Sequence, residues 1–241
     1  MNSFRRSIEI FLDSLFPLCC VACERLLPRT PVRFLCDDCR SRIVPPGAFA
    51  CPTCGARIPY GVMGLPPLQA LCHPAAGYIV LAAGSYSALP LQKLISVLKF
   101  DRRIAAATEL GELLRAVLGA AHIQVEHFIF VPVPLALGRL RSRGFNQAEE
   151  ISRQIVGQNG QLRTVLVRKR ETKPQTTLDN WRERRENVAG SFAMHNPTSI
   201  VGKDVVLVDD VRTTGATIEA AAQILKAAGA RRVIALVAAQ A

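Results

Sequence analysis

The sequence predicts an α/β protein with a doubly wound parallel sheet, preceded by a small zinc-ribbon domain. After residue 76, short apolar runs of strand length alternate with helical patterns, and strand–helix–strand units of this length favour parallel pairing. All eight cysteines occur before residue 73, and six of them form Cys-x-x-Cys pairs. We therefore expect a zinc-ribbon domain over residues 1–75 and an α/β domain over residues 76–241.

Composition and charge narrow the class of protein. The 241 residues are 49% hydrophobic and 20% charged, as in a folded globular protein with a sizeable core. No apolar stretch approaches the roughly 18 residues of a membrane-spanning helix, and Glu9 and Asp13 interrupt the N-terminal apolar run, so we expect a cytoplasmic protein without stable membrane insertion. The net charge of +11 favours anionic partners. Twelve basic and five acidic side chains lie between Arg139 and Arg185, which concentrates the excess there.

Two Cys-x-x-Cys pairs predict a first zinc site. Cys20 and Cys23 form one pair, Cys36 and Cys39 form the other, and 12 residues separate them. Each pair resembles a zinc knuckle, in which a tight turn directs two thiolates at one tetrahedral ion. A reducing cytosol argues against disulfides. We therefore expect structural Zn²⁺ bound by four thiolates, with scattered buried thiols as the alternative.

The third pair, Cys51 and Cys54, indicates a second zinc site. These thiolates need two further ligands, and only Cys72 and His73 lie at a suitable distance along the chain. Two interpretations stay open. Either His73 completes a site of three thiolates and one imidazole, or the site has decayed and the three cysteines are merely buried.

The elements of the α/β part follow a segment rich in Pro and Gly at residues 59–77. In chain order the patterns predict a strand at 78–83, an apolar run at 89–100, a helix at 105–118, a strand at 128–133, a helix at 147–156, a strand at 205–208, a helix at 217–228 and a strand at 233–237. Ligands of such sheets bind at the carboxyl ends of the strands. We therefore expect the functional site in the loops after Val133 and Val208.

The loop expected after Val208 carries the residues of a ribose 5-phosphate site. Asp209 and Asp210 offer carboxylates at a strand end that can accept hydrogen bonds from two sugar hydroxyls. Hydroxyl donors, a glycine that permits close approach, and the positive end of the next helix suit a phosphate. The residues expected to hold the phosphate are Thr213, Thr214, Gly215, Ala216 and Thr217. The alternative is an Asp-rich helix cap followed by ordinary Thr turns.

Residues 205–217 resemble the ribose-phosphate-binding signature of type I phosphoribosyltransferases, which use phosphoribosyl pyrophosphate and Mg²⁺. The whole chain resembles the ComF family, also called ComFC/GntX-like proteins, which join a double zinc ribbon to such a domain and have a role in natural competence and DNA uptake. The other segments that carry the resemblance are Leu98-Lys99-Phe100, Val131-Pro132-Val133-Pro134, Arg143-Gly144-Phe145-Asn146-Gln147 and residues 175–192.

The resemblance implies roles for two further groups of residues. It assigns the loop that begins at Val133 and Pro134 to the pyrophosphate side, where guanidinium forks suit a diphosphate; a merely basic loop is the alternative. The arginines that follow are Arg139, Arg141 and Arg143. The resemblance also implies a flexible loop that closes over phosphoribosyl pyrophosphate, with Gln175, Arg182, Arg185 and Asn187 as candidates to reach the substrate.

Three functional hypotheses remain open from the sequence. The first is a phosphoribosyltransferase, a magnesium-dependent transferase with Asp209 and Asp210 in the catalytic site. The second is a non-catalytic protein that handles single-stranded DNA in natural transformation, with competence helicase-type proteins as partners; its +11 charge suits phosphates. The third is a regulator that senses phosphoribosyl pyrophosphate or a nucleotide. The sequence does not indicate the acceptor nucleophile.

Overall fold

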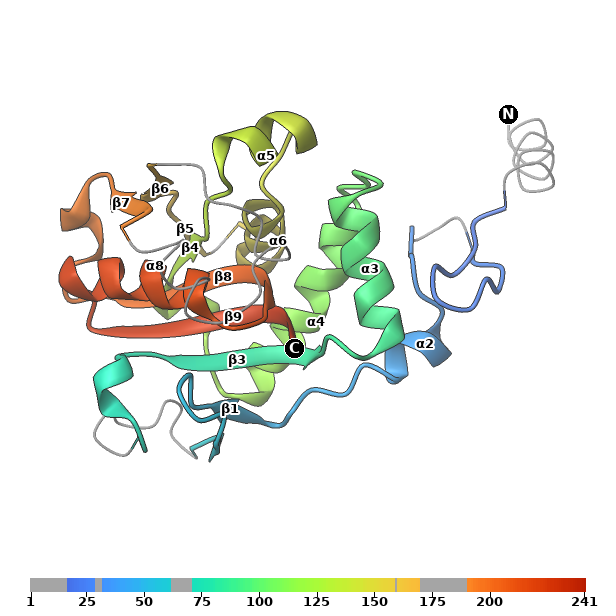
Figure 1. Cartoon of the computed structure of the whole chain (residues 1–241). Helices are drawn as coiled ribbons and strands as arrows, with labels where there is room; N and C mark the ends of the chain where they lie inside the picture. The colour runs from blue at the N-terminus through green and yellow to red at the C-terminus, as the bar shows by residue number, and fades with distance from the viewer. Residues whose placement is uncertain (1–16, 29–31, 62–70, 159, 170–189) are drawn as a thin grey trace.

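The computed structural model describes residues 17–28, 32–61, 71–158, 160–169 and 190–241. Within these residues a central sheet has seven strands in the order β2-β1-β3-β9-β8-β4-β5, and β6 pairs with β7 in a smaller sheet (Figure 1). The strands are β1 (Ala48–Ala50), β2 (Arg57–Pro59), β3 (Ile79–Ser85), β4 (Ile129–Pro132), β5 (Gln161–Leu162), β6 (Leu166–Arg168), β7 (Phe192–Met194), β8 (Asp204–Arg212) and β9 (Arg232–Gln240).

The central sheet is mostly parallel, which confirms the predicted fold class. Strands β3, β9, β8, β4 and β5 pair in parallel with their neighbours. The hairpin β1–β2 is antiparallel and joins the edge of β3 through the pair Ala50 and Val80. The predicted domain boundary near residue 76 stays a prediction, and the chain on both sides of it contributes strands to one sheet.

The helices occupy both faces of this sheet (Figure 1). The α-helices are α2 (Asp37–Ser41), α3 (Leu89–Lys99), α4 (Ala106–Ala120), α5 (Leu137–Arg143), α6 (Gln147–Val156) and α8 (Ala216–Ala227); the 3₁₀ turns are η2 (Pro74–Ala76), η3 (Val125–His127) and η5 (Pro197–Ile200). Helix α6 has the predicted bounds because Asn146 caps it: its side-chain oxygen accepts the Ala148 N–H at 3.2 Å. None of the described helices is long and apolar enough to span a membrane.

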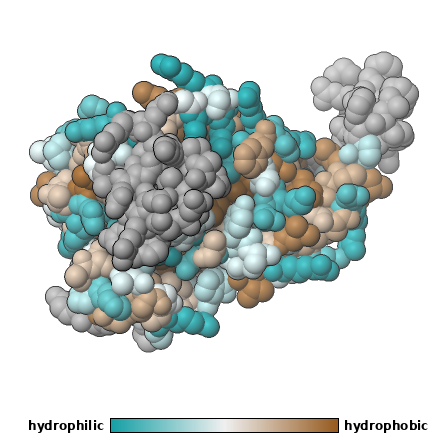
Figure 2. Space-filling view, in the orientation of Figure 1, coloured by the Kyte–Doolittle hydropathy of each residue, from teal (hydrophilic) through white to brown (hydrophobic). Residues whose placement is uncertain are grey.

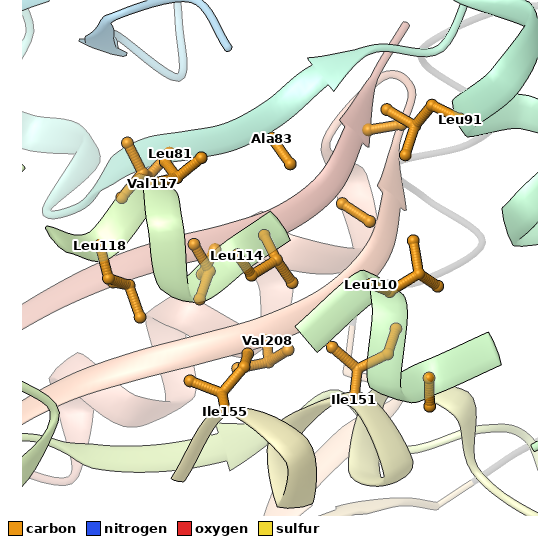
Figure 3. Close-up of a cluster of buried hydrophobic side chains, with 14 of the residues drawn as sticks. Leu81, Ala83, Leu91, Leu110, Leu114, Val117, Leu118, Ile151, Ile155 and Val208 are labelled. Atoms are coloured by element: carbon orange, nitrogen blue, oxygen red, sulfur yellow. The ribbon is translucent and has the colours of Figure 1, made fainter. Parts of the chain in front are cut away.

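Two apolar layers hold the sheet and helices together. On one face, α4 places Leu110, Leu114 and Leu118 at helical spacing against α6 and the sheet, where they meet Ile151 and Val208 (Figure 3). On the other face, α8 and the β6–β7 ribbon cover a separate layer. Because both faces are covered, β3 and β4 are almost entirely apolar, as is typical of strands in a parallel sheet.

Strand β8 is longer than its sequence predicts. We expected a strand at 205–208 followed by a loop, but pairing with β9 continues through Asp209 and Val211 to Arg212. The expectation that the loop starts after Val208 is therefore wrong. The apolar run marks only the part of β8 that is buried on both faces, whereas an equally long β9 supplies backbone partners for the polar residues beyond it. The loop begins at Thr213.

Candidate functional site

Asp210 lies buried at the carboxyl end of β8. Its side chain forms an ion pair with Lys99 in the last turn of α3, with 2.7 Å between Lys99 Nζ and Asp210 Oδ1. Asp210 is 4% exposed, and among the described residues its other oxygen, Oδ2, has no hydrogen-bond partner. A buried carboxylate oxygen without a partner is unfavourable, so this oxygen is available to a hydroxyl donor or a cation.

Asp209 points to the opposite face of β8, because successive side chains of a strand alternate. Its Oδ1 accepts the backbone N–H of Asp210 at 2.9 Å. Burial first, and then the negative charge of Asp210, raise the pKa of Asp209 to about 7, although Lys99 and Arg168 oppose the shift. A carboxyl that titrates near neutral pH at a strand end is typical of a functional site. Arg168, on β6, is a cation close enough for its charge to act on Asp209.

The predicted phosphate loop connects β8 to α8. Thr213 and Thr214 are exposed, and Thr217 lies half-buried in the first turn of α8. Gly215 caps α8 with φ = +82°, a left-handed conformation that a side chain disfavours. The first turn of a helix presents backbone N–H groups and a positive dipole end, which suit a phosphate.

The β4–α5 segment forms the predicted pyrophosphate side. Asn146 Nδ2 donates to the carbonyl of Val133 at 3.0 Å, which fixes the strand end, and Pro134 is half-buried beside it. Arg139 and Arg143 are four residues apart on α5 and share one face, whereas Arg141 is exposed on another. The residues expected in the flexible loop, Gln175, Arg182, Arg185 and Asn187, lie outside the described residues.

Arg143 is the member of this group that approaches the acidic pair. It donates to Gln147 Oε1 at 2.5 Å, and its guanidinium lies 6.0 Å from the centre of the Phe100 ring. Burial lowers the pKa of Arg143, while the charge of Asp210 acts in the opposite direction. The structure thus brings Arg143 and Arg139 towards the carboxyl edge of the sheet and leaves Arg141 away from it.

The first cysteine group converges on one point. The ligand atoms of Cys20, Cys23, Cys36 and Cys39 all lie within 4.8 Å of one another, and Cys23 Sγ is 3.6 Å from Cys36 Sγ. Ligands of a tetrahedral thiolate site are about 3.8 Å apart, so this group could hold a metal ion. Burial disfavours the thiolate of Cys20, but backbone hydrogen bonds outweigh burial and lower its pKa to about 6.

The second group forms a similar cluster from Cys51, Cys54, Cys72 and His73. Cys51 Sγ lies 3.4 Å from His73 Nδ1, and Cys54 Sγ lies 3.6 Å from Cys72 Sγ, close to the roughly 3.5–3.8 Å of tetrahedral ligands. Backbone hydrogen bonds, acting against burial, lower the pKa of Cys51 to about 6. The adjacent Cys72 and His73 both point into this group, so it too could hold a metal ion. Cys54 and Cys72 are exposed, which disagrees with the alternative of merely buried thiols.

Two arginines at the site are not predicted by the sequence. Arg168 carries no motif signal, because the fold alone brings β6 beside Asp209. Arg212 lies inside the 205–217 segment, yet nothing in the sequence predicts its partner: its Nη2 donates to the carbonyl of Pro52 at 2.7 Å, across 160 residues of the chain.

Asp209 and Asp210 thus lie near the carboxyl end of a parallel strand, and a helix capped by a glycine follows. The family described as phosphoribosyl transferase domain matches residues 129–241, which include β4, β8, α8 and β9. By this match, the α/β part of the chain is a phosphoribosyltransferase-type domain.

Comparison with individual proteins narrows the class from a phosphoribosyl transferase domain to one family. DNA utilization protein YhgH of Escherichia coli O157:H7 is 34% identical over 208 residues, covering 83% of this chain and 87% of that protein. Competence protein ComFC of Streptococcus pneumoniae is 29% identical, covering 86% and 88%. A solved structure described as the allosteric regulatory enzyme of purine biosynthesis covers 55% of this chain and 25% of its own, with 21% identity and a TM-score of 0.35. The chain belongs to the ComF family, to which its likeness to YhgH and ComFC assigns it.

Proposed function

We propose that the protein binds phosphoribosyl pyrophosphate together with Mg²⁺ at the carboxyl edge of its sheet and acts as a phosphoribosyltransferase. The observation that carries the proposal is Oδ2 of buried Asp210, which has no hydrogen-bond partner among the described residues. It lies beside Asp209, whose pKa is raised, close to the loop that leads into α8. Such a pair of acceptors beside a helix N-terminus fits a ribose diol and its 5-phosphate.

Each group has a role in this proposal. Asp209 and Asp210, on opposite faces of β8 near its carboxyl end, each hold a ribose hydroxyl, and Asp209 becomes a charged acceptor when it loses its proton near neutral pH. Arg139 and Arg143 stabilise the pyrophosphate as it leaves, because guanidinium forks match its oxygens; Arg141 is too far from their face to share this role. The 5-phosphate binds the loop residues Thr213, Thr214, Gly215, Ala216 and Thr217. Bound Mg²⁺ would neutralise pyrophosphate oxygens. Positioning and electrostatics, rather than a covalent intermediate, would stabilise an oxocarbenium-like transition state.

The proposal is tested by a screen for pyrophosphate release. Purified protein is mixed with phosphoribosyl pyrophosphate, Mg²⁺ and one candidate nucleophile at a time, drawn from nucleobases and small amines. Release that requires both Mg²⁺ and a particular nucleophile supports transfer and identifies the acceptor. Binding without release from any nucleophile would instead support the regulatory hypothesis, in which the protein senses phosphoribosyl pyrophosphate or a nucleotide.

We also propose that the metal in both cysteine groups is Zn²⁺ and that the protein works in the cytoplasm. Three thiolates with one imidazole, or four thiolates, are donor sets that favour Zn²⁺, and the distances within the groups support a tetrahedral ion. Thiol groups that serve as metal ligands are typical of a reducing compartment. The division into domains at residues 1–75 and 76–241 is part of the same proposal, with the zinc-binding residues in the first.

A second candidate function is the handling of single-stranded DNA, which one surface of the described residues supports. Phe100 is 72% exposed beside Arg143, and exposed Arg102 and Arg103 follow it. Figure 2 shows mostly hydrophilic residues over α5 with isolated hydrophobic ones between them. An exposed ring next to guanidinium groups suits a base and its phosphate. The names of YhgH and ComFC, which refer to DNA utilization and competence, agree with this function.

Salt dependence tests the DNA hypothesis. Affinity for a single-stranded oligonucleotide should fall steeply as salt rises, because bound Lys and Arg release counterions, and Phe100→Ala should weaken binding by roughly tenfold through lost stacking. Unchanged affinity in Phe100→Ala would remove this surface from the proposal. Partners of the competence helicase type stay a prediction, to be tested by co-purification.

A further inference from the structure

Arg212 connects two parts of the molecule that are 160 residues apart in the chain. It is the last residue of β8, it is 8% exposed, and its Nη2 donates to the carbonyl of Pro52 at 2.7 Å. Pro52 follows Cys51 directly in the turn of the second cysteine group. The guanidinium therefore holds the turn that carries two of the four candidate metal ligands.

The same guanidinium supports the start of α8. A Cβ added at Gly215 would lie 2.9 Å from both Nε and Nη2 of Arg212, so the glycine backbone rests directly on the guanidinium. Within the described residues Nε has no hydrogen-bond partner, although the side chain is more than nine-tenths buried. Burying a guanidinium with one unused donor costs free energy of folding. The contacts that Arg212 makes with Pro52 and Gly215 therefore have to offset this cost.

The turn that Arg212 holds is itself shaped by the cysteine group. The N–H of Gly55 donates to the carbonyl of Cys51 at 3.0 Å, and the N–H of Cys51 donates to the carbonyl of Ala56 at 2.9 Å. Cys51 and Cys54 come from this turn, whereas Cys72 and His73 come from a segment beyond it in the chain. A bound metal ion joins the two segments and thereby fixes the carbonyl that Arg212 uses.

We propose that metal at the second cysteine group holds the 213–217 loop in its binding conformation, with Arg212 as the positioning residue that couples them. Without the ion, the turn that carries the Pro52 carbonyl becomes more mobile, and Arg212 loses the acceptor that holds its side chain in one conformation. The guanidinium then no longer packs steadily against the backbone at Gly215. Metal occupancy of the second cysteine group then changes the conformational mobility of the 213–217 loop, which couples the two sites. The inference for ligand affinity rests on the proposed function; the inference for loop order does not.

The test measures hydrogen exchange of the 213–217 amides in the full-length, metal-loaded protein without ligand. Four proteins form a cycle: wild type, Cys72→Ser, Arg212→Met and the double variant. We expect each single change to speed exchange in this loop by roughly tenfold and the double variant to match the single variants, because both act through one contact. Bound metal, counted in each protein, should fall by one ion in Cys72→Ser and stay unchanged in Arg212→Met.

Two controls isolate the coupling. Arg232→Met removes a guanidinium that pairs with Asp204 at the far end of β8, and Cys23→Ser removes a ligand of the first group; neither should change exchange of the loop relative to the rest of α8. Cys54→Ser, at another exposed ligand, replaces Cys72→Ser if the latter does not fold. Chelator titration of the wild type gives the same comparison without any substitution.

Three results would overturn the inference: unchanged exchange in Cys72→Ser, an additive effect in the double variant, or a metal count that Cys72→Ser leaves unchanged. Affinity for phosphoribosyl pyrophosphate, measured on the same proteins, separates this inference from the proposed function. If wild type binds none but the exchange cycle behaves as expected, the coupling stands and the ligand is wrong. If Arg212→Met alone weakens binding while Cys72→Ser does not, Arg212 contacts the ligand directly and the coupling is wrong.

Discussion

Lys99 at the end of α3 and Asp210 near the end of β8 form an ion pair, with 2.7 Å between Nζ and Oδ1. This contact ties the helix that follows β3 to the strand on which the acidic pair lies. It also supplies the positive charge that permits a carboxylate to stay buried there, so the acidic pair has a structural partner before any ligand binds.

Replacing Lys99 by Met should therefore destabilise the protein. The change leaves the Asp210 carboxylate buried without its cation, and we expect the free energy of unfolding to fall by about 1–3 kcal/mol. Denaturant unfolding measures the change. Lys93→Met, at an exposed position of the same helix, is the matched control and should stay within about 0.5 kcal/mol of wild type. Equal stability of the two variants would show that the ion pair contributes nothing.

The raised pKa of Asp209 should make the free energy of unfolding depend on pH. Its pKa is about 7 in the folded protein, well above the ordinary 3.8, so the folded state retains a proton that the unfolded state loses near pH 4. The contribution of Asp209 to stability is therefore lost as pH rises towards 7. Relative to Asp209→Asn, wild type should lose up to about 2–3 kcal/mol between pH 5 and pH 7 and nothing more above pH 8. Urea unfolding of both proteins across this range checks the sign; a constant difference would contradict it.

Gly215→Ala should disturb the start of α8. The residue has φ = +82°, and a Cβ would lie 2.9 Å from the Arg212 guanidinium. We expect a loss of about 1–3 kcal/mol in the free energy of unfolding. Gly119→Ala, within α4, is the control, since a Cβ there would meet no described residue within 4 Å. We expect it to be neutral or stabilising by up to about 1 kcal/mol. Thermal unfolding of both variants gives the comparison.

The two cysteine groups should each bind one metal ion, but loss of the ion from the first group should lower the unfolding midpoint more than loss of the ion from the second. Phe34 and Leu35, next to Cys36, belong to the main apolar core, and the Phe34 N–H donates to buried Glu109 on α4 at 2.9 Å. Cys36→Ser should therefore remove one ion and lower the unfolding midpoint by several degrees, more than Cys72→Ser at an exposed ligand. A colorimetric metal assay with thermal unfolding measures both. Two ions retained in Cys36→Ser would exclude that site.

The sequence predicted most of the fold because the decisive patterns are local. Asn146 caps α6 where the helical pattern begins, and the apolar run at Val205 marks β8. The sequence predicts too early an end for β8, because the extension of this strand depends on pairing with β9, more than twenty residues away along the chain. The same limit applies to the site: Asp209 and Asp210 were found from their motif, but the partner of Arg212 exists only once Pro52 has folded next to it.

The ligand-binding site is tested most directly by calorimetric titration of Mg²⁺ and phosphoribosyl pyrophosphate into wild type and a variant with both Asp209→Asn and Asp210→Asn. Asn keeps the size of each side chain but removes its charge. Asp204→Asn, at the other end of β8 where it pairs with Arg231 and Arg232, controls for the loss of a carboxylate from this strand and should keep wild-type affinity.

We predict that wild type binds and that the double variant binds roughly tenfold to a thousandfold more weakly. This range follows from about 1.5–3 kcal/mol per charged hydrogen bond, discounted for non-additivity. Equal affinity in the two proteins would contradict the assignment of Asp209 and Asp210 to the ribose. Absence of binding by wild type would contradict the phosphoribosyl pyrophosphate site itself and leave the handling of single-stranded DNA as the better-supported function.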